Sequence, residues 1–115
     1  MAKKSIIGSK EYVTIFGQNK TRKVLARIDT GATKCSIDTN RAKSLGLGPV
    51  ILEKKVKSAH GTSMRSLILA RIMIAGRRFK VFFTIADRKH MKYSVLVGRN
   101  ILKRGFLIDP SRKLR

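Results

Sequence analysis

Hydrophobic and polar residues alternate along much of the chain with the two-residue period of β-strands. The clearest case is 77–86, where every second residue from Phe79 to Ile85 is apolar, and a nearly continuous apolar run precedes it at 67–75. Alternation predicts a strand with one buried face, whereas the continuous run predicts a strand that is central or buried on both faces. Further extended segments are expected at 12–16, 22–28, 36–38, 50–58, 94–97 and 106–108.

Two short helices are expected between these strands. Asp38 or Thr39 is placed to cap the first, which stops at Gly46, and the second covers 100–104. Small polar residues at 59–63 are typical of a hairpin tip. The pattern predicts an all-β, barrel-like domain with one or two short helices.

Length and composition fit a single domain. The chain has 115 residues, 43% of them hydrophobic, which supports one modest core, and no apolar run reaches the length of a membrane span. The N-terminal residues lack a signal-peptide apolar region, and the one cysteine, Cys35, cannot form an internal disulfide. We therefore expect a cytoplasmic protein with a basic arm at 1–10, a domain at 11–110 and a basic tail at 111–115.

The net charge changes this picture most. Lys and Arg total 27 against 6 Asp and Glu, a net charge of +21. So large an excess favours a polyanionic partner, most simply rRNA or the ribosome, although a solvated basic surface is the alternative. Aromatic residues are few, which favours phosphate contacts over base stacking. The candidate nucleic-acid-binding residues are Lys3, Lys4, Lys54, Lys55, Lys57, Arg77, Arg78, Arg112 and Lys113.

Two stretches carry candidate chemistry. Asp29-Thr30-Gly31-Ala32 ends an expected strand with a carboxylate on a glycine-supported turn, where folds often present a catalytic group. Farther along, the apolar run that ends at Val97 is followed by Gly98-Arg99-Asn100 and an expected helix. A turn aspartate with no catalytic role is the alternative for Asp29.

Together these stretches resemble the retropepsins, the aspartic peptidases of retroviral type, over residues 11–110. A narrower resemblance is to small prokaryotic retropepsin-like proteins catalogued as ATP-dependent zinc proteases, carried by 27–33, 83–88, 91–93 and 96–99. The resemblance implies an all-β, closed acid-protease barrel, half of a pepsin-type enzyme. It implies a catalytic Asp29 in the active-site turn of Thr30, Gly31 and Ala32, a supporting loop of Leu96, Val97, Gly98 and Arg99, and a flap that contains His60, Gly61 and Thr62.

Carboxylate-catalysed peptide hydrolysis needs two carboxylates that share one proton. The other five acids are Glu11, Asp38, Glu53, Asp87 and Asp109, and none lies in a second Asp-Thr-Gly. A peptidase built from this chain must therefore be a homodimer with one Asp29 per subunit. Where retroviral enzymes have two acids after Asp-Thr-Gly-Ala, this chain has Thr33 and Lys34, so Arg99 loses its expected ion-pair partner.

Cofactor sites are not expected. Cys35, His60 and His90 are too widely spaced to form a recognisable metal site, and no glycine-rich phosphate loop is present. We therefore predict neither a metal nor an ATP site. Two functions remain in competition: a homodimeric aspartic endopeptidase associated with nucleic acid or the ribosome, and a non-enzymatic rRNA-binding protein on the same fold.

Overall fold

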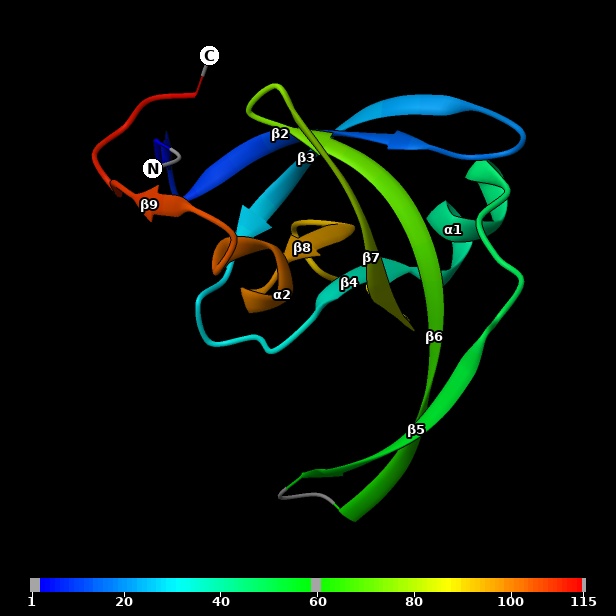
Figure 1. The fold of residues 1–115 in the computed structure, drawn as a ribbon. Helices are drawn as coiled ribbons and strands as arrows, with labels where there is room; N and C mark the ends of the chain where they lie inside the picture. The colour runs from blue at the N-terminus through cyan, green and yellow to red at the C-terminus, as the bar shows by residue number, and fades with distance from the viewer. Residues whose placement is uncertain (1–2, 59–60, 115) are drawn as a thin grey trace.

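The computed structural model describes the backbone of residues 3–58 and 61–114, and the side chains of all of these except 56–58. Figure 1 shows the arrangement of the elements. The strands are β1 Ser5–Ile7, β2 Lys10–Phe16, β3 Thr21–Ile28, β4 Cys35–Asp38, β5 Leu52–Ser58, β6 Gly61–Ile74, β7 Arg77–Ala86, β8 Val95–Val97 and β9 Phe106–Ile108, and the helices are α1 Thr39–Leu45 and α2 Arg99–Leu102. In the described part of the chain, neither helix is long and apolar enough to cross a membrane.

Six strands close into a barrel. Their order is β2-β3-β8-β4-β7-β6, and β6 pairs back onto β2 in antiparallel fashion, which completes the ring. Closure leaves no free edge within this ring, so every strand in it has two neighbours. The predicted all-β, closed barrel is confirmed.

Alternating apolar positions fill the inside of the barrel. On β6, Ala70, Ile72 and Ile74 point inward and are at most 3% exposed, whereas Arg71 faces solvent. The apolar run at 67–75 was expected to be central or buried on both faces. In the structure it is buried on one face and partly exposed on the other.

Two parallel pairings bring distant segments of the chain to one end of the barrel. β3 runs parallel to β8 with Ile28 beside Val97, and β4 runs parallel to β7. Because parallel strands end on the same side, Asp29 and Gly98 leave the barrel side by side. This register positions the site described below.

The two ends of the described chain also meet. β1 pairs in parallel with β9, apart from the barrel, and Figure 1 shows the termini near each other. Arg77 stabilises this corner: its guanidinium donates to the carbonyls of Arg104 at 2.6 Å and Gly105 at 3.1 Å. Part of the segment expected as an arm thus forms a strand.

Asp38 caps α1 and also holds a distant loop. Its carboxylate accepts from the backbone N–H of Asn40 at 3.1 Å, of Arg41 at 3.4 Å, and of Arg88 at 2.7 Å. Gly46 ends the helix with a left-handed φ of 75°. The N–H of Arg88, followed by the two cap N–H groups, holds the pKa of Asp38 below its ordinary value, because all three bonds favour the ionised form.

Asp38→Ala should lower the free energy of unfolding by about 2 kcal/mol at pH 7, because a helix cap and a buried acceptor are lost together. The lowered pKa means that the carboxylate stabilises the fold above the ordinary carboxyl pKa, and that this contribution disappears as pH falls through the folded-state value. Urea unfolding at pH 7 and pH 3 checks this. The difference in unfolding free energy between wild type and Asp38→Ala should be smaller at pH 3 than at pH 7. An equal difference at the two pH values would contradict a stabilising role of the ionised carboxylate.

Beyond the barrel, β5 and the outer part of β6 form a hairpin that projects from the body (Figure 1). Its described side chains at 52–55 and 61–64 are exposed along its length, from Leu52 at 51% near the barrel to Met64 at 56% farther out. Few buried side chains hold this hairpin, so its position relative to the barrel is only weakly restrained.

Candidate active site

The Asp29 turn begins where β3 leaves the barrel. The N–H of Asp29 donates to the Val97 carbonyl at 2.9 Å, which fixes the backbone of the turn against β8. One carboxylate oxygen, Oδ1, accepts from the N–H of Gly31 at 2.9 Å. Asp29 is half-buried. The turn therefore holds a carboxylate in a fixed orientation at the mouth of the barrel.

The supporting loop packs directly behind this turn. The N–H of Arg99 donates to the Ala32 carbonyl at 2.8 Å, and the N–H of Asn100 donates to the Thr33 carbonyl at 3.1 Å. Gly98 lies so close that a Cβ there would stand 2.5 Å from the Lys34 carbonyl oxygen. Only a glycine fits at this contact.

Asn100 ties the turn to the strands on both sides, a role not predicted from sequence. Its Oδ1 accepts from the N–H of Cys35 at 3.0 Å and from Cys35 Sγ at 3.2 Å, while its Nδ2 donates to the Phe82 carbonyl at 2.9 Å. Burial raises the pKa of the Cys35 thiol to about 12, so the thiol stays neutral and donates. The one available signal was the position of Asn100 directly after Gly98-Arg99.

Arg99 has hydrogen-bonding partners in place of the acids expected by resemblance. Its Nη1 donates to the Thr30 carbonyl at 2.8 Å, and its Nη2 donates to Thr33 Oγ1 at 3.2 Å. A guanidinium keeps its charge in such bonds, and its planar fork suits two acceptors. Arg99 thus still braces the Asp29 turn, with a hydroxyl and a carbonyl instead of carboxylates.

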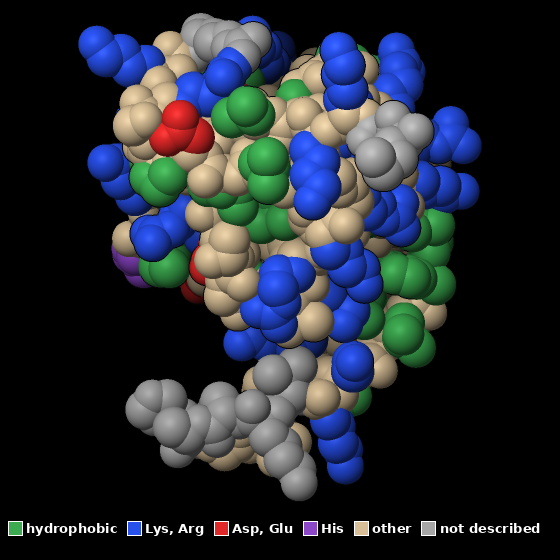
Figure 2. All heavy atoms as spheres, turned by 60° about the vertical axis from the view of Figure 1, so that its left-hand side comes forward, with side chains coloured by type: hydrophobic (Ala, Val, Ile, Leu, Met, Phe, Trp, Pro, Cys, Tyr) green, Lys and Arg blue, Asp and Glu red, His purple; other side chains and the backbone are tan. Residues whose placement is uncertain are grey.

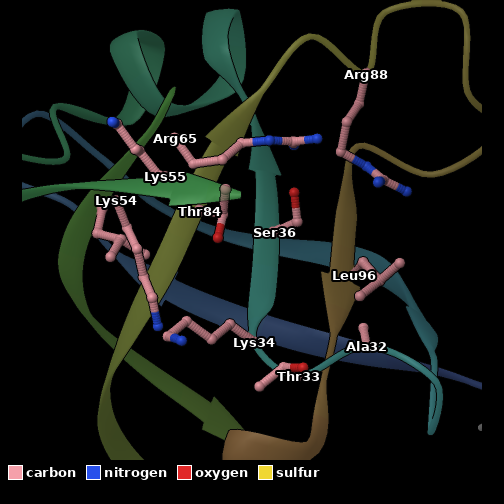
Figure 3. A pocket seen from close by; sticks show the side chains of 11 residues that line it. Ala32, Thr33, Lys34, Ser36, Lys54, Lys55, Arg65, Thr84, Arg88 and Leu96 are labelled. Atoms are coloured by element: carbon pink, nitrogen blue, oxygen red, sulfur yellow. The ribbon is translucent and has the colours of Figure 1, made fainter. Parts of the chain in front are cut away.

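A cavity of about 620 Å³ opens beside the turn. Figure 3 shows the side chains that surround it, which come from the Asp29 turn, β4, β5, β6, β7, β8 and the loop after β7. The lining residues are Ala32, Thr33, Lys34, Ser36, Lys54, Lys55, Arg65, Leu67, Thr84, Arg88 and Leu96. Five of these are basic and none is acidic, so the cavity favours an anionic ligand.

Arg88 is a site residue that sequence reasoning missed. Its Nε donates to the Tyr93 carbonyl at 3.0 Å, and the charges of Asp29 and Asp38 both act on its guanidinium. Burial lowers the pKa of Arg88, and the two carboxylates oppose this effect. Arg88 therefore adds positive charge on the Asp29 side of the cavity.

The remaining predicted site residues are dispersed. Gly61 and Thr62 lie in the exposed outer part of β6, far along the hairpin from the barrel, while His60 and the side chain of Lys57 fall outside the described residues. No group of three His, Cys, Asp or Glu side chains that could hold a metal ion occurs within residues 3–58 and 61–114.

The predicted nucleic-acid-binding residues do not form one patch. Lys54 and Lys55 line the cavity. The guanidinium of the partly exposed Arg77 instead lies over the rings of Phe79 and Phe106. Lys3, Lys4, Arg78, Arg112 and Lys113 lie on other parts of the surface. Figure 2 shows Lys and Arg side chains spread widely over the visible face.

Residues 38–114 match the family model described as RimB-like, retropepsin-like aspartic endopeptidase RimB. The match includes the supporting loop and begins after Asp29. A Legionella pneumophila protein of unknown function aligns over 96% of both chains with 20% identity and a TM-score of 0.66. The EIAV protease, solved with an inhibitor, aligns over 90% of this chain and 88% of its own, with 22% identity and a TM-score of 0.63. These likenesses establish the fold.

Two curated relatives are named probable alpha-L-glutamate ligase, from Shewanella pealeana and Shewanella halifaxensis. Each is 27% identical over an alignment 133 positions long, which covers 94% of this chain. The chain spans 29% of the length of these relatives. A region like this chain is therefore found as one part of a larger protein.

Proposed function

This chain belongs to the RimB-like family of retropepsin-like aspartic endopeptidases, and we propose that it is an endopeptidase that acts as a homodimer with Asp29 of each subunit in one shared site. The observation that supports this most is the bracing of the Asp29 turn by Gly98, Arg99 and Asn100 beside an open cavity. Such bracing holds a carboxylate ready for a reaction instead of leaving it on a mobile surface loop.

Within one subunit, the other acids are committed elsewhere. Asp38 caps α1, Asp109 accepts from Ser111, Glu11 accepts from the N–H of Gly8, and Asp87 accepts from the N–H of Lys89. The sixth acid, Glu53, lies exposed on β5. A second carboxylate for Asp29 therefore comes from a second copy of the chain.

Two Asp29 carboxyl groups in one site can carry out peptide hydrolysis. One Asp29 carboxylate takes a proton from water as the water oxygen attacks the peptide carbonyl carbon, while the protonated Asp29 of the partner hydrogen-bonds to the carbonyl oxygen. The tetrahedral species then breaks its C–N bond as the Asp29 carboxyl group that took the water proton transfers it to the leaving nitrogen. The hairpin of β5 and β6 covers the substrate and excludes water.

We further propose that the substrate is an acidic peptide. The cavity beside Asp29 has five basic lining residues. In addition, a region similar to this chain occurs within proteins named as glutamate ligases, which makes a glutamate-containing peptide the natural candidate.

Light scattering tests the dimer directly. The protein should show a concentration-dependent mass that approaches twice 12.9 kDa. Since the net charge of +21 opposes association, moderate salt or an anionic peptide should promote dimerisation. A monomer at high concentration in both conditions would exclude a shared site.

Association with cytoplasmic rRNA or the ribosome is a second candidate, supported by the net charge of +21 and its spread over the surface. If 6–10 phosphates are neutralised, affinity for rRNA should fall by about 10³–10⁵ between 50 and 200 mM salt. Cosedimentation with ribosomes across this range checks it, with Asp29→Asn expected to bind as wild type does. Protein that runs free of RNA at physiological salt would contradict this role.

A further inference from the structure

Two lysines face each other across the cavity from different parts of the fold. Lys34 follows the Asp29 turn, and Lys54 lies on β5 of the projecting hairpin. Figure 3 shows their ammonium groups directed toward one another, whereas the neighbouring Lys55 extends away from both. Burial lowers the pKa of Lys34, and the nearby charge of Lys54 lowers it further.

A third cation lies next to this pair. Arg65 on β6 is the direct cross-strand partner of Lys54, and its side chain extends across the cavity in Figure 3. Like charges directly opposite one another destabilise a strand pair. Among the described residues, the one salt bridge joins Lys89 to Asp87 at 3.9 Å, so no carboxylate in that part of the chain neutralises Lys34, Lys54 or Arg65.

We propose that Lys34 and Lys54 hold one carboxylate of the substrate between them, so that an acidic side chain draws the β5–β6 hairpin down over the site. Without such a carboxylate, repulsion between the two ammonium groups, which face each other in the structure, opposes the position of the hairpin over the Asp29 turn. With it, repulsion is replaced by two charge-assisted hydrogen bonds that connect the hairpin to the barrel. Hairpin closure is thereby coupled to the charge of a substrate side chain.

The cavity offers what such a carboxylate needs. Its oxygens accept up to four hydrogen bonds, and the hydroxyls of Ser36 and Thr84 line the same cavity as the two lysines. The hairpin itself has few buried contacts to hold it in either position. A modest change in the Lys34–Lys54 interaction is therefore enough to shift it.

This inference rests on the proposed function, and its test does not depend on cleavage. The Asp29→Asn protein is titrated with two fluorescein-labelled Gly/Ser/Ala peptides that differ only in a central Glu or Gln. The Glu peptide should bind about 10- to 100-fold more tightly, as expected for hydrogen bonds to a charged group. Lys34→Gln and Lys54→Gln should each remove most of this preference, and together they should remove little more.

Lys80→Gln is the matched control, since it removes the same charge from an exposed position on β7 that does not line the cavity. It should keep the preference for the Glu peptide. Backbone amide exchange of 52–55 and 61–66 provides the second readout: the Glu peptide should slow it in the Asp29→Asn protein but not when Lys54→Gln is added.

Several outcomes would overturn the inference: equal affinity for the two peptides, no measurable binding of either, or a Lys80→Gln effect equal to that of Lys54→Gln. So would an RNA oligonucleotide that displaces the Glu peptide and itself loses affinity equally in the Lys34→Gln and Lys80→Gln variants. Cleavage of the Gln peptide by wild type would still support the peptidase. Conversely, a preserved Glu preference without cleavage by wild type would support the lysine pair alone.

Discussion

Replacement of Asp29 by Asn should lower the cleavage rate of an unstructured acidic peptide by about 10²–10⁴-fold, because the amide can neither take a proton from water nor share one with its partner. The fold should remain intact, since the Asn Oδ1 can still accept from the N–H of Gly31, as Asp29 does at 2.9 Å. Initial rates at equal protein concentration, with circular dichroism of both proteins, measure this.

Asp87→Asn is the control for this change. It removes the same charge from an exposed acid that accepts a hydrogen bond from the N–H of Lys89, and it should cleave at the wild-type rate. Equal cleavage by wild type and Asp29→Asn would show either a contaminating peptidase or a site elsewhere in the chain.

The second large effect is expected at Gly98. In Gly98→Ala, the new methyl carbon would lie 2.5 Å from the Lys34 carbonyl oxygen and 2.9 Å from that of Ala32, both backbone atoms. The supporting loop has to move away from the Asp29 turn, which should cost about 3 kcal/mol of unfolding free energy by overpacking. The same movement lengthens the 2.8 Å bond from Arg99 to Ala32 and displaces Asp29, so cleavage should also be lost.

Gly76→Ala is the control for Gly98→Ala, because it introduces backbone strain without a packing clash. Gly76 has open space around its missing Cβ but a φ of 73°, so alanine there should cost about 1 kcal/mol through backbone strain alone. Gly98 has a φ of −104°, which any residue adopts. Urea unfolding should therefore rank Gly98→Ala well below Gly76→Ala in stability; the reverse order would contradict the close contact behind the turn.

The barrel was predictable because its signals are local. The alternation in 77–86 and the Asp38 and Gly46 caps depend on neighbours in sequence, and the structure confirms them at β7 and α1. The retropepsin-like fold was predicted by resemblance to a known family, on the paired motifs at 29–32 and 96–99.

The electrostatics of the site could not be predicted in the same way. Lys34 and Lys54 are 20 positions apart in sequence, and they meet only because β5 folds back along β6 over the cavity. Sequence reasoning placed Lys54 and Lys55 in one nucleic-acid-binding set, whereas in the structure both line the cavity and only Lys54 is directed toward Lys34 (Figure 3). Likewise, the partners of Arg99 depended on the shape of the turn, which lets a carbonyl and a hydroxyl take the place of acids.

Subunit mixing tests the shared site most directly. A fixed amount of wild type is allowed to exchange with a tenfold excess of Asp29→Asn, and cleavage of an acidic peptide is followed. If two Asp29 carboxylates make one site, most wild-type subunits enter inactive mixed dimers, and activity should fall to roughly one-eleventh. Activity that stays at the wild-type level after exchange would show that each chain acts alone, which would contradict the homodimeric aspartic peptidase.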